Sequence, residues 1–176
     1  MRSKAMKFSA LVGFASATVA ATACPVERAH YKFTTSESTG YADFVIVPRP
    51  AWMPGSDDIA AFHLSFEPHR TSATARFDDW FIYDQGSSGI IHLLESTDRQ
   101  KPSWDLWELP HEPGLLDRVR DFIAWGKDEV VTTVIPSPGS TAPVYIFLPH
   151  LTESIRTSTG MDVGRGMFKL HRCESR

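Results

Sequence analysis

Asparagine is absent from the chain of 176 residues, and glutamine occurs only as Gln85 and Gln100. The missing asparagine excludes N-glycosylation sequons, a Cys-His-Asn catalytic arrangement and an asparagine-based oxyanion hole. Cysteine is nearly as scarce, because the chain has only two, and their spacing matches no zinc-binding pattern. Glycine-rich phosphate-binding loops and internal repeats are missing as well. From these absences we predict a protein that uses neither a metal nor a cofactor.

Positive charge is also in deficit, with 18 Lys and Arg against 21 Asp and Glu. Three of those cations lie in residues 1–7, ahead of an uncharged apolar run from 8 to 21. A basic start, a short apolar run and an Ala-x-Ala triplet are typical of a secretory signal peptide. We therefore predict a leader over residues 1–23 and a single secreted domain over residues 24–176.

The sequence after the leader narrows the class of partner. No later hydrophobic run is long enough to span a membrane, so no transmembrane segment is expected. The excess of acidic residues argues against a dedicated surface for nucleic acid or for an anionic membrane. An extracellular partner or a glycan is the expected partner, and the sequence leaves the oligomeric state open.

The two cysteines stand at the two ends of the predicted domain, as Cys24 and Cys173. An even number of cysteines in a secreted chain favours a disulfide. Segments 29–33 and 166–172 alternate like strands, and adjacent terminal strands would bring the cysteines together. In the chain-entropy model, a bridge over so long a loop adds about 4 to 5 kcal/mol to the free energy of unfolding. Two alternatives stay open: a lipid anchor on Cys24, because residues 21–24 resemble a lipobox without its leucine, and two free thiols.

Strict alternation of apolar and polar residues marks the segment 59–67, IAAFHLSFE, as a strand with one apolar face. The pattern resumes over 71–84 and again, after the turn-like QGSSG, over 90–96. These segments predict an antiparallel meander from 59 to 96. Further strands are predicted from shorter apolar runs at 41–47, 129–135 and 143–148.

Two turns of the meander, placed independently, agree on which face is apolar. A tight turn sets Phe62 opposite Ala75, so that a large and a small side chain share that face. The loop QGSSG aligns the third strand with the same apolar face. The one discord is that Asp79 then stands opposite Glu95, and two like charges in that position predict a bulge or a slip at this end.

Apolar residues recur at helical spacing between 114 and 125, with charged residues mostly on the other side. Pro113 and Gly126 are typical of the start and the end of a helix. We predict a helix over 114–125 whose apolar stripe covers the meander. The predicted fold class is α+β and β-rich, an antiparallel sheet with about one covering helix and with N- and C-terminal strands that are possible neighbours.

The polar face of the meander carries the candidate binding residues. Arg76, Asp78 and Trp80 share this face in the predicted register. The indole of Trp80 offers a stacking plane for a sugar ring, and Arg76 and Asp78 can hydrogen-bond its hydroxyls. The tryptophan pair in segment 104–107 adds some support. The first hypothesis is therefore an extracellular binding or interaction module, with a carbohydrate as its ligand.

The same face also collects His63, Glu67 and His92, which allows a hydrolytic interpretation. The two histidines would serve as general acid and base, Glu67 or Asp78 would orient a histidine, and Arg76 would stabilise an oxyanion. Two histidines, an arginine and a carboxylate on a sheet face are similar to the active-site groups of secreted microbial ribonucleases. This resemblance implies phosphodiester transfer, and a small secreted hydrolase of ribonuclease or esterase type is the second hypothesis.

Both hypotheses require that the polar face is open to solvent. Ile82 and Leu94 lie on it and indicate partial burial, which would leave its charged residues as ordinary cross-strand ion pairs. The third hypothesis is then a structural or effector-type protein without a small-molecule site. Its contacts would lie around Trp52 and in the 97–113 segment.

Overall fold

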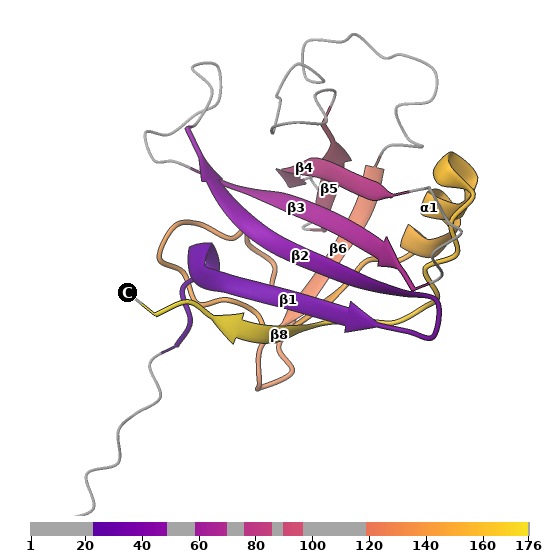
Figure 1. The fold of residues 1–176 in the computed structure, drawn as a ribbon. Coiled ribbons are helices and arrows are strands. Elements are labelled where there is room, and N and C mark those ends of the chain that lie inside the picture. The colour runs from indigo at the N-terminus through magenta and orange to yellow at the C-terminus, as the bar shows by residue number, and fades with distance from the viewer. Residues whose placement is uncertain (1–22, 49–58, 70–75, 86–89, 97–118, 176) are drawn as a thin grey trace, which may run out of the picture.

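Eight antiparallel strands close into a barrel (Figure 1). Each strand pairs with the next one along the chain, and the last pairs back with the first. Closure leaves no free sheet edge, a property that the predicted open sheet does not have. The strands are β1 (Ala29–Thr34), β2 (Ser38–Val47), β3 (Ile59–Pro68), β4 (Phe77–Gln85), β5 (Ile91–Glu95), β6 (Val119–Trp125), β7 (Tyr145–Phe147) and β8 (Phe168–Cys173). The computed structural model describes residues 23–48, 59–69, 76–85, 90–96 and 119–175.

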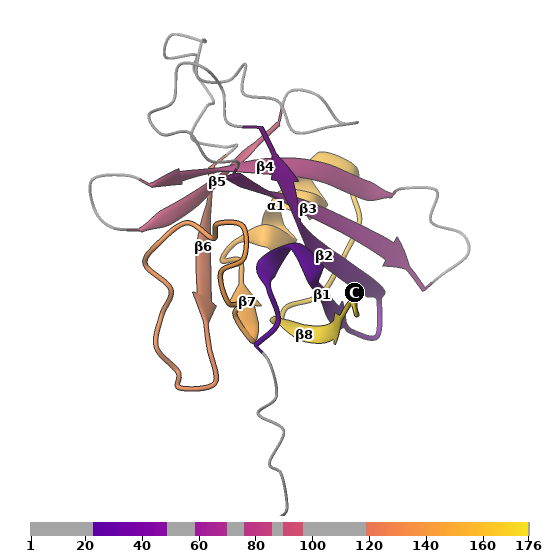
Figure 2. The same ribbon diagram turned by 90° about the vertical axis from the view of Figure 1, so that its left-hand side faces the viewer.

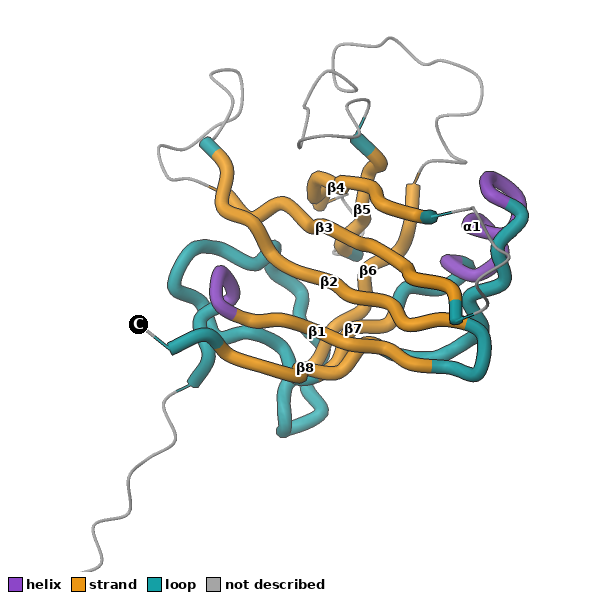
Figure 3. Tube along the Cα trace, in the orientation of Figure 1, coloured by secondary structure: helices purple, strands orange, loops and turns teal. Residues whose placement is uncertain are grey.

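Two short helices lie at opposite ends of the barrel, as Figures 2 and 3 show. The 3-10 helix η1 (Val26–Arg28) precedes β1, and the α-helix α1 (Leu151–Thr159) connects β7 to β8. Each helix inserts apolar side chains into its end of the barrel: Val26 and Ile155 are fully buried, and Leu151 is nearly so. We refer to the two ends as the η1 end and the α1 end.

Aromatic side chains line the inside of the barrel. The alternation of the strands turns every second residue inward, and Phe62 packs edge to face against Phe44 and Phe122 with ring centroids 5.4 and 5.8 Å apart. Edge-to-face contacts of this kind add to the free energy that burial of the rings already supplies. Of the meander residues predicted to form the apolar face, the described ones, among them Phe62, Leu64 and Phe81, are buried here.

Glycine is required at one position of the wall. Gly40 on β2 stands opposite Phe66 on β3, and a Cβ atom at Gly40 would lie 2.5 Å from the Phe66 ring. Real Cβ atoms do not come so close to another carbon. The missing side chain therefore lets the Phe66 ring lie flat against the neighbouring strand.

The two ends of the described chain are tied together at the η1 end. Strands β1 and β8 pair side by side, which confirms the predicted adjacency of the terminal strands. Cys24 and Cys173 form a disulfide with Cα atoms 5.9 Å apart, so the predicted bridge is confirmed. The alternatives of a lipid anchor and of free thiols are wrong, because a sulfur in a disulfide is neither a thiol nor free to carry a thioether.

The predicted helix over 114–125 is wrong where the structure describes it. Residues Val119–Trp125 form strand β6, which pairs with β5 on one side and β7 on the other. Phe122 and Ala124 point inward and are buried. Apolar residues at 119, 122 and 123 fit a short strand as well as a helix, and the pairing needed to close the barrel outweighs the local pattern. The helix of the described residues is α1 instead.

The predicted strand pairings also need correction. In the β3–β4 pair Phe62 stands opposite Phe81 rather than Ala75, because the connection between the strands is longer than a tight turn. In the β4–β5 pair Glu95 stands opposite Phe81 rather than Asp79. Both shifts are by an even number of residues, so the apolar face stays the same while the like-charge contact disappears.

Other predicted strands are shorter than expected or missing. The run at 129–135 contributes a single isolated bridge, between Trp125 and Val131, and the run at 143–148 contributes only β7. Several predictions fall on residues outside the described ranges: the leader, the segment around Trp52, the pairing partner Ala75, the tryptophans at 104 and 107, and the first part of the 114–125 helix.

Candidate functional site

Three of the predicted site residues come together on the outer surface of β3 and β4. The His63 and Trp80 side chains stack with ring centroids 4.3 Å apart and planes 29° from parallel. His63 Nε2 also lies 2.6 Å from Asp78 Oδ1. The Asp78 side chain is 67% exposed against 24% for His63, so the carboxylate faces solvent while the imidazole is partly covered by the indole.

Arg76 and Glu67 lie beside this cluster at the α1 end of the same two strands. Continuing the β3–β4 pairing by one step places them opposite each other. Both side chains are exposed, and neither has a hydrogen-bond or ion-pair partner among the described residues. They extend the polar outer surface without forming a fixed geometry.

His92 belongs to a different cluster. It lies on β5 and pairs with Asp121 of β6, with Nδ1 and Oδ1 3.0 Å apart. The whole of strand β4 separates it from His63, and neighbouring strands are about 4.8 Å apart. His63 and His92 therefore pair with different carboxylates, Asp78 and Asp121, and do not form a single cluster.

A third His–Asp pair escaped the sequence analysis. His30 on β1 faces Asp43 on β2, with Nδ1 and Oδ1 2.5 Å apart, and its Nε2 lies 3.0 Å from a Glu174 oxygen. The alternation of the two strands would have placed both residues outward, but only the register shows that they face each other. Such pairs are ordinary outer-surface contacts of neighbouring strands.

The outer surface of the meander is only partly open. Ala61, Ile82 and Leu94 point outward, away from the barrel core, and all three are buried. Ile82 and Leu94 stand opposite each other on β4 and β5. The surface is thus open at Asp78 and covered at Ile82, which leaves a narrower exposed area than a fully open sheet face would offer.

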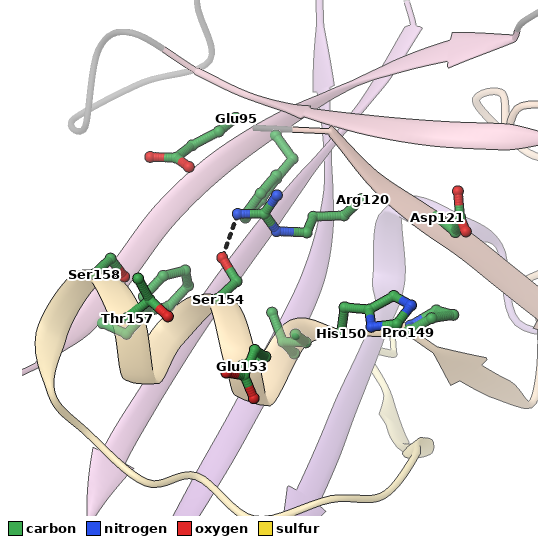
Figure 4. A pocket seen from close by; sticks show the side chains of 12 residues that line it. Glu95, Arg120, Asp121, Pro149, His150, Glu153, Ser154, Thr157 and Ser158 are labelled. Carbon is green, nitrogen blue, oxygen red and sulfur yellow. Dashed lines mark hydrogen bonds between the residues drawn. The ribbon is translucent and has the colours of Figure 1, made fainter. Parts of the chain in front are cut away.

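A hollow of about 620 Å³ lies at the α1 end, between α1 and strands β4 to β6 (Figure 4). Phe77, Phe81 and Leu151 form its apolar floor, and all three are buried. Polar side chains from the end of β5, from the start of β6 and from α1 surround the opening. We call it the Glu95 hollow, after the carboxylate that reaches it from the inward-facing side of β5.

The charged groups around the Glu95 hollow are mostly compensated. Asp121 pairs with His92, and Glu153 bonds to Arg156 at 2.8 Å. Arg120 donates a hydrogen bond to the Ser154 hydroxyl, drawn in Figure 4. That bond crosses from β6 to α1 and holds the helix over the end of the barrel.

Glu95 differs from these groups. Its half-buried carboxylate has no hydrogen-bond or ion-pair partner among the described residues. It lines both the Glu95 hollow and a smaller adjoining space of about 250 Å³ that reaches Arg76 and Asp79. In the sequence, Glu95 continues the alternation of Ile91 and Leu93, whose side chains face the barrel interior. A charged residue at an inward-facing position near the end of a strand is the signal that could have located the hollow.

Neither helix of the described chain has the length or the apolar character of a membrane span. Within the same residues, no three His, Cys, Asp or Glu side chains are grouped so that they could hold a metal ion. The chain matches no protein-family model, no curated protein and no solved structure. Its function is therefore inferred from the chemistry of the site alone.

Proposed function

We propose that the protein is a secreted binding protein that holds a small molecule in the Glu95 hollow. The observation that carries this proposal is a carboxylate without a partner in the described structure, placed beside an apolar floor. Small-ligand sites are typically concave and apolar, with a few polar groups that orient the ligand. A volume of about 620 Å³ lies within the range of about 300 to 1,000 Å³ that is usual for such sites.

The ligand's chemistry follows from that of the walls. An ionised carboxylate only accepts hydrogen bonds, so the group facing Glu95 must donate, as a hydroxyl or an ammonium does. The opposite side of the ligand must be apolar where it meets Phe77, Phe81 and Leu151. A sugar ring meets both requirements, because its hydroxyls project from the edge and its C–H groups cover a face. Carbohydrate therefore stays the first ligand class.

An extracellular location supports the same proposal. The disulfide between Cys24 and Cys173 is compatible with an oxidising compartment, where such bridges persist. The predicted leader over residues 1–23 would deliver the chain there. A free extracellular sugar, or the end of a glycan chain, would meet the hollow in that setting.

The direct test compares the wild-type protein with Glu95→Gln. A panel of mono- and oligosaccharides and of small amines is screened by thermal shift, and hits are titrated by calorimetry. We expect Glu95→Gln to weaken binding by about tenfold or more, because hydrogen bonds to a charged acceptor contribute about 1.5 to 3 kcal/mol. The variant keeps the shape of the side chain, so the fold is preserved.

Two further variants on α1 make a matched pair. Thr157 lines the hollow and Arg156 does not, and both are exposed on the same helix. Thr157→Trp should abolish binding by filling the space. Arg156→Trp breaks the ion pair with Glu153 but leaves the space open, so the ligand should still bind. A ligand that binds Glu95→Gln and Thr157→Trp as tightly as the wild type occupies another place, and the proposal is then rejected.

The outer surface of β3 and β4 is the second candidate for a carbohydrate. What favours it is the His63–Trp80 stack beside the exposed Asp78 carboxylate, with Arg76 unpaired among the described side chains. The same panel separates the two places. If Arg76→Gln lowers the affinity for a sugar and Glu95→Gln does not, that sugar is bound on the outer surface of β3 and β4.

A further inference from the structure

A second hollow, of about 560 Å³, lies on the other side of the first turn of α1. It is formed by the β7–α1 connection and by the segment 163–166 ahead of β8. The turn that separates it from the Glu95 hollow contributes Pro149 and His150 to both. We call it the Arg165 hollow, after the cation that stands on its wall.

The walls of the Arg165 hollow are mainly apolar. Phe33, Phe168, Leu148 and Val163 are buried and form its inner side. Phe147 completes the wall and is 37% exposed, although a large aromatic side chain usually gains by burial. An apolar body in the hollow would cover this ring.

The charge on the Arg165 hollow is opposite to that of Glu95. The Arg165 guanidinium is exposed and has no hydrogen-bond or ion-pair partner in the described part of the chain. The one carboxylate on the wall, Glu153, is already bonded to Arg156 at 2.8 Å. Because the chain is acidic overall, with a formal charge of −3, an uncompensated cation at an apolar hollow is a local exception.

The backbone immediately before Arg165 is anchored by three hydrogen bonds. The carbonyl of Val163 accepts hydrogen bonds from the Thr35 and Ser38 hydroxyls, each at 3.2 Å. The carbonyl of Gly164 accepts one from Thr152 of α1. These contacts tie the segment to the β1–β2 turn and to α1, so Arg165 projects from a fixed backbone.

We propose that the Arg165 hollow binds a small organic anion, a carboxylate carried on an aliphatic or aromatic body. The guanidinium fork matches a carboxylate in a two-bond geometry, and the apolar walls take the rest of the molecule. The two hollows share the residues of the first turn of α1, but this proposal goes beyond the proposed function, because Arg165 lines only this hollow and its ligand has the opposite charge. Each hollow can be occupied or fail on its own.

The test uses hexanoate and 1-hexanol, which share an apolar body and differ in charge. Binding to the full protein is followed by NMR shifts of the Gly164 and Gly166 amides during titration. We expect saturable hexanoate binding that Arg165→Gln weakens at least about tenfold and that Arg165→Lys weakens less. 1-Hexanol should bind weakly, and Arg165→Gln should not change its affinity.

The matched control is Arg172→Gln, which removes the same charge from an exposed position on β8 that does not line the hollow. It should leave hexanoate binding unchanged. Three results would overturn the proposal: no saturable binding of hexanoate, equal affinity in the wild type and Arg165→Gln, or equal weakening by Arg165→Gln and Arg172→Gln. The last result would show a diffuse charge effect and no site.

Discussion

The two ends of the barrel are closed in different ways. At the η1 end, a disulfide joins Cys24, just ahead of η1, to Cys173 at the end of β8. Val26 is fully buried there, and the Tyr31 hydroxyl donates a hydrogen bond to the Pro143 carbonyl at 2.8 Å. At the α1 end, a helix of nine residues inserts Leu151 and Ile155 and leaves a hollow on either side. The η1 end is closed by a covalent bond and buried side chains, and the α1 end is closed by one short helix.

The same difference appears in the residues that face inward. The buried inward residues near the η1 end, such as Ala29, Tyr31 and Tyr83, are apolar or are tyrosines. Near the α1 end, Glu95 and Arg120 occupy the inward phase of their strands. A charge inside a barrel is costly unless it is paired or reaches solvent, and both of these residues are only half-buried beside the hollows.

The largest effect is expected from removing the covalent tie at the η1 end. Cys24→Ser combined with Cys173→Ser should lower the free energy of unfolding by up to about 4 to 5 kcal/mol in the chain-entropy model. Urea denaturation of the oxidised wild type and the double variant measures this difference. Ligand affinity at the Glu95 hollow should not change while the double variant is folded, because the bridge is at the far end. A loss of affinity in the folded variant would mean that the two ends are coupled.

The second effect tests whether α1 is an integral part of the core. Ile155 is fully buried, so Ile155→Ala should destabilise the protein by about 2 to 4 kcal/mol, and Ile155→Val by about 0.5 to 1.5 kcal/mol. Thermal or urea unfolding of the two variants gives the comparison. If Ile155→Ala lowers the free energy of unfolding by less than the loss expected for Ile155→Val, Ile155 is not packed into the core as the structure has it. The position of α1 as a wall of both hollows would then be wrong.

The smallest effect concerns two buried tyrosines inside the barrel. Tyr31 Oη has a partner in the Pro143 carbonyl, whereas Tyr83 Oη is buried without a hydrogen-bond partner among the described residues. Tyr31→Phe should cost about 1 kcal/mol, because it leaves that carbonyl without its donor. Tyr83→Phe should be neutral or stabilising. Urea titrations at pH 7 measure the free energy of unfolding of both variants. Equal losses of stability in the two variants would contradict the expected difference between the two hydroxyls.

These tyrosines also predict how stability depends on pH. Burial raises the pKa of Tyr31 and the pKa of Tyr83 well above the usual value, which is about 10. The folded state therefore keeps both hydroxyls protonated while the unfolded chain ionises. Their contribution to stability is present below about pH 10 and falls as the pH rises further, by about 1.4 kcal/mol per pH unit for each tyrosine. Tyr83→Phe should make that fall shallower.

Local patterns predicted one part of the fold well. The apolar face of the meander followed from strict alternation in IAAFHLSFE, and an even register shift leaves the facing of every side chain unchanged. The disulfide followed from two cysteines near terminal strands. These features depend on short stretches of sequence, so they survived errors in the turns.

Closure of the barrel depended on contacts that no local pattern shows. Strand β7 has three residues, too few for a clear alternation, and the 119–125 run fits both a helix and a strand. Helix α1 is rich in Ser and Thr, which have modest helix propensity, and only Leu151 and Ile155 mark its buried side. The candidate hollows depend on closure, and so the sequence alone did not reveal them.

Glu95 shows how a local conflict can mark a site. The predicted register placed Glu95 opposite Asp79, and the two like charges predicted a bulge or a slip in the strand pairing. The actual register places it opposite Phe81, and its charge faces a hollow. A charged residue in the inward phase is thus better explained by the opening of the barrel than by a fault in the strand pairing.

The bridge between Cys24 and Cys173 turns the chain between them into a covalent ring. A protease that cuts one loop anywhere in this ring opens it without releasing a fragment, since both pieces stay joined through the sulfurs and through the paired strands. Two cuts in different loops are needed before a piece can leave. A single nick within the ring therefore leaves the molecule in one covalent piece.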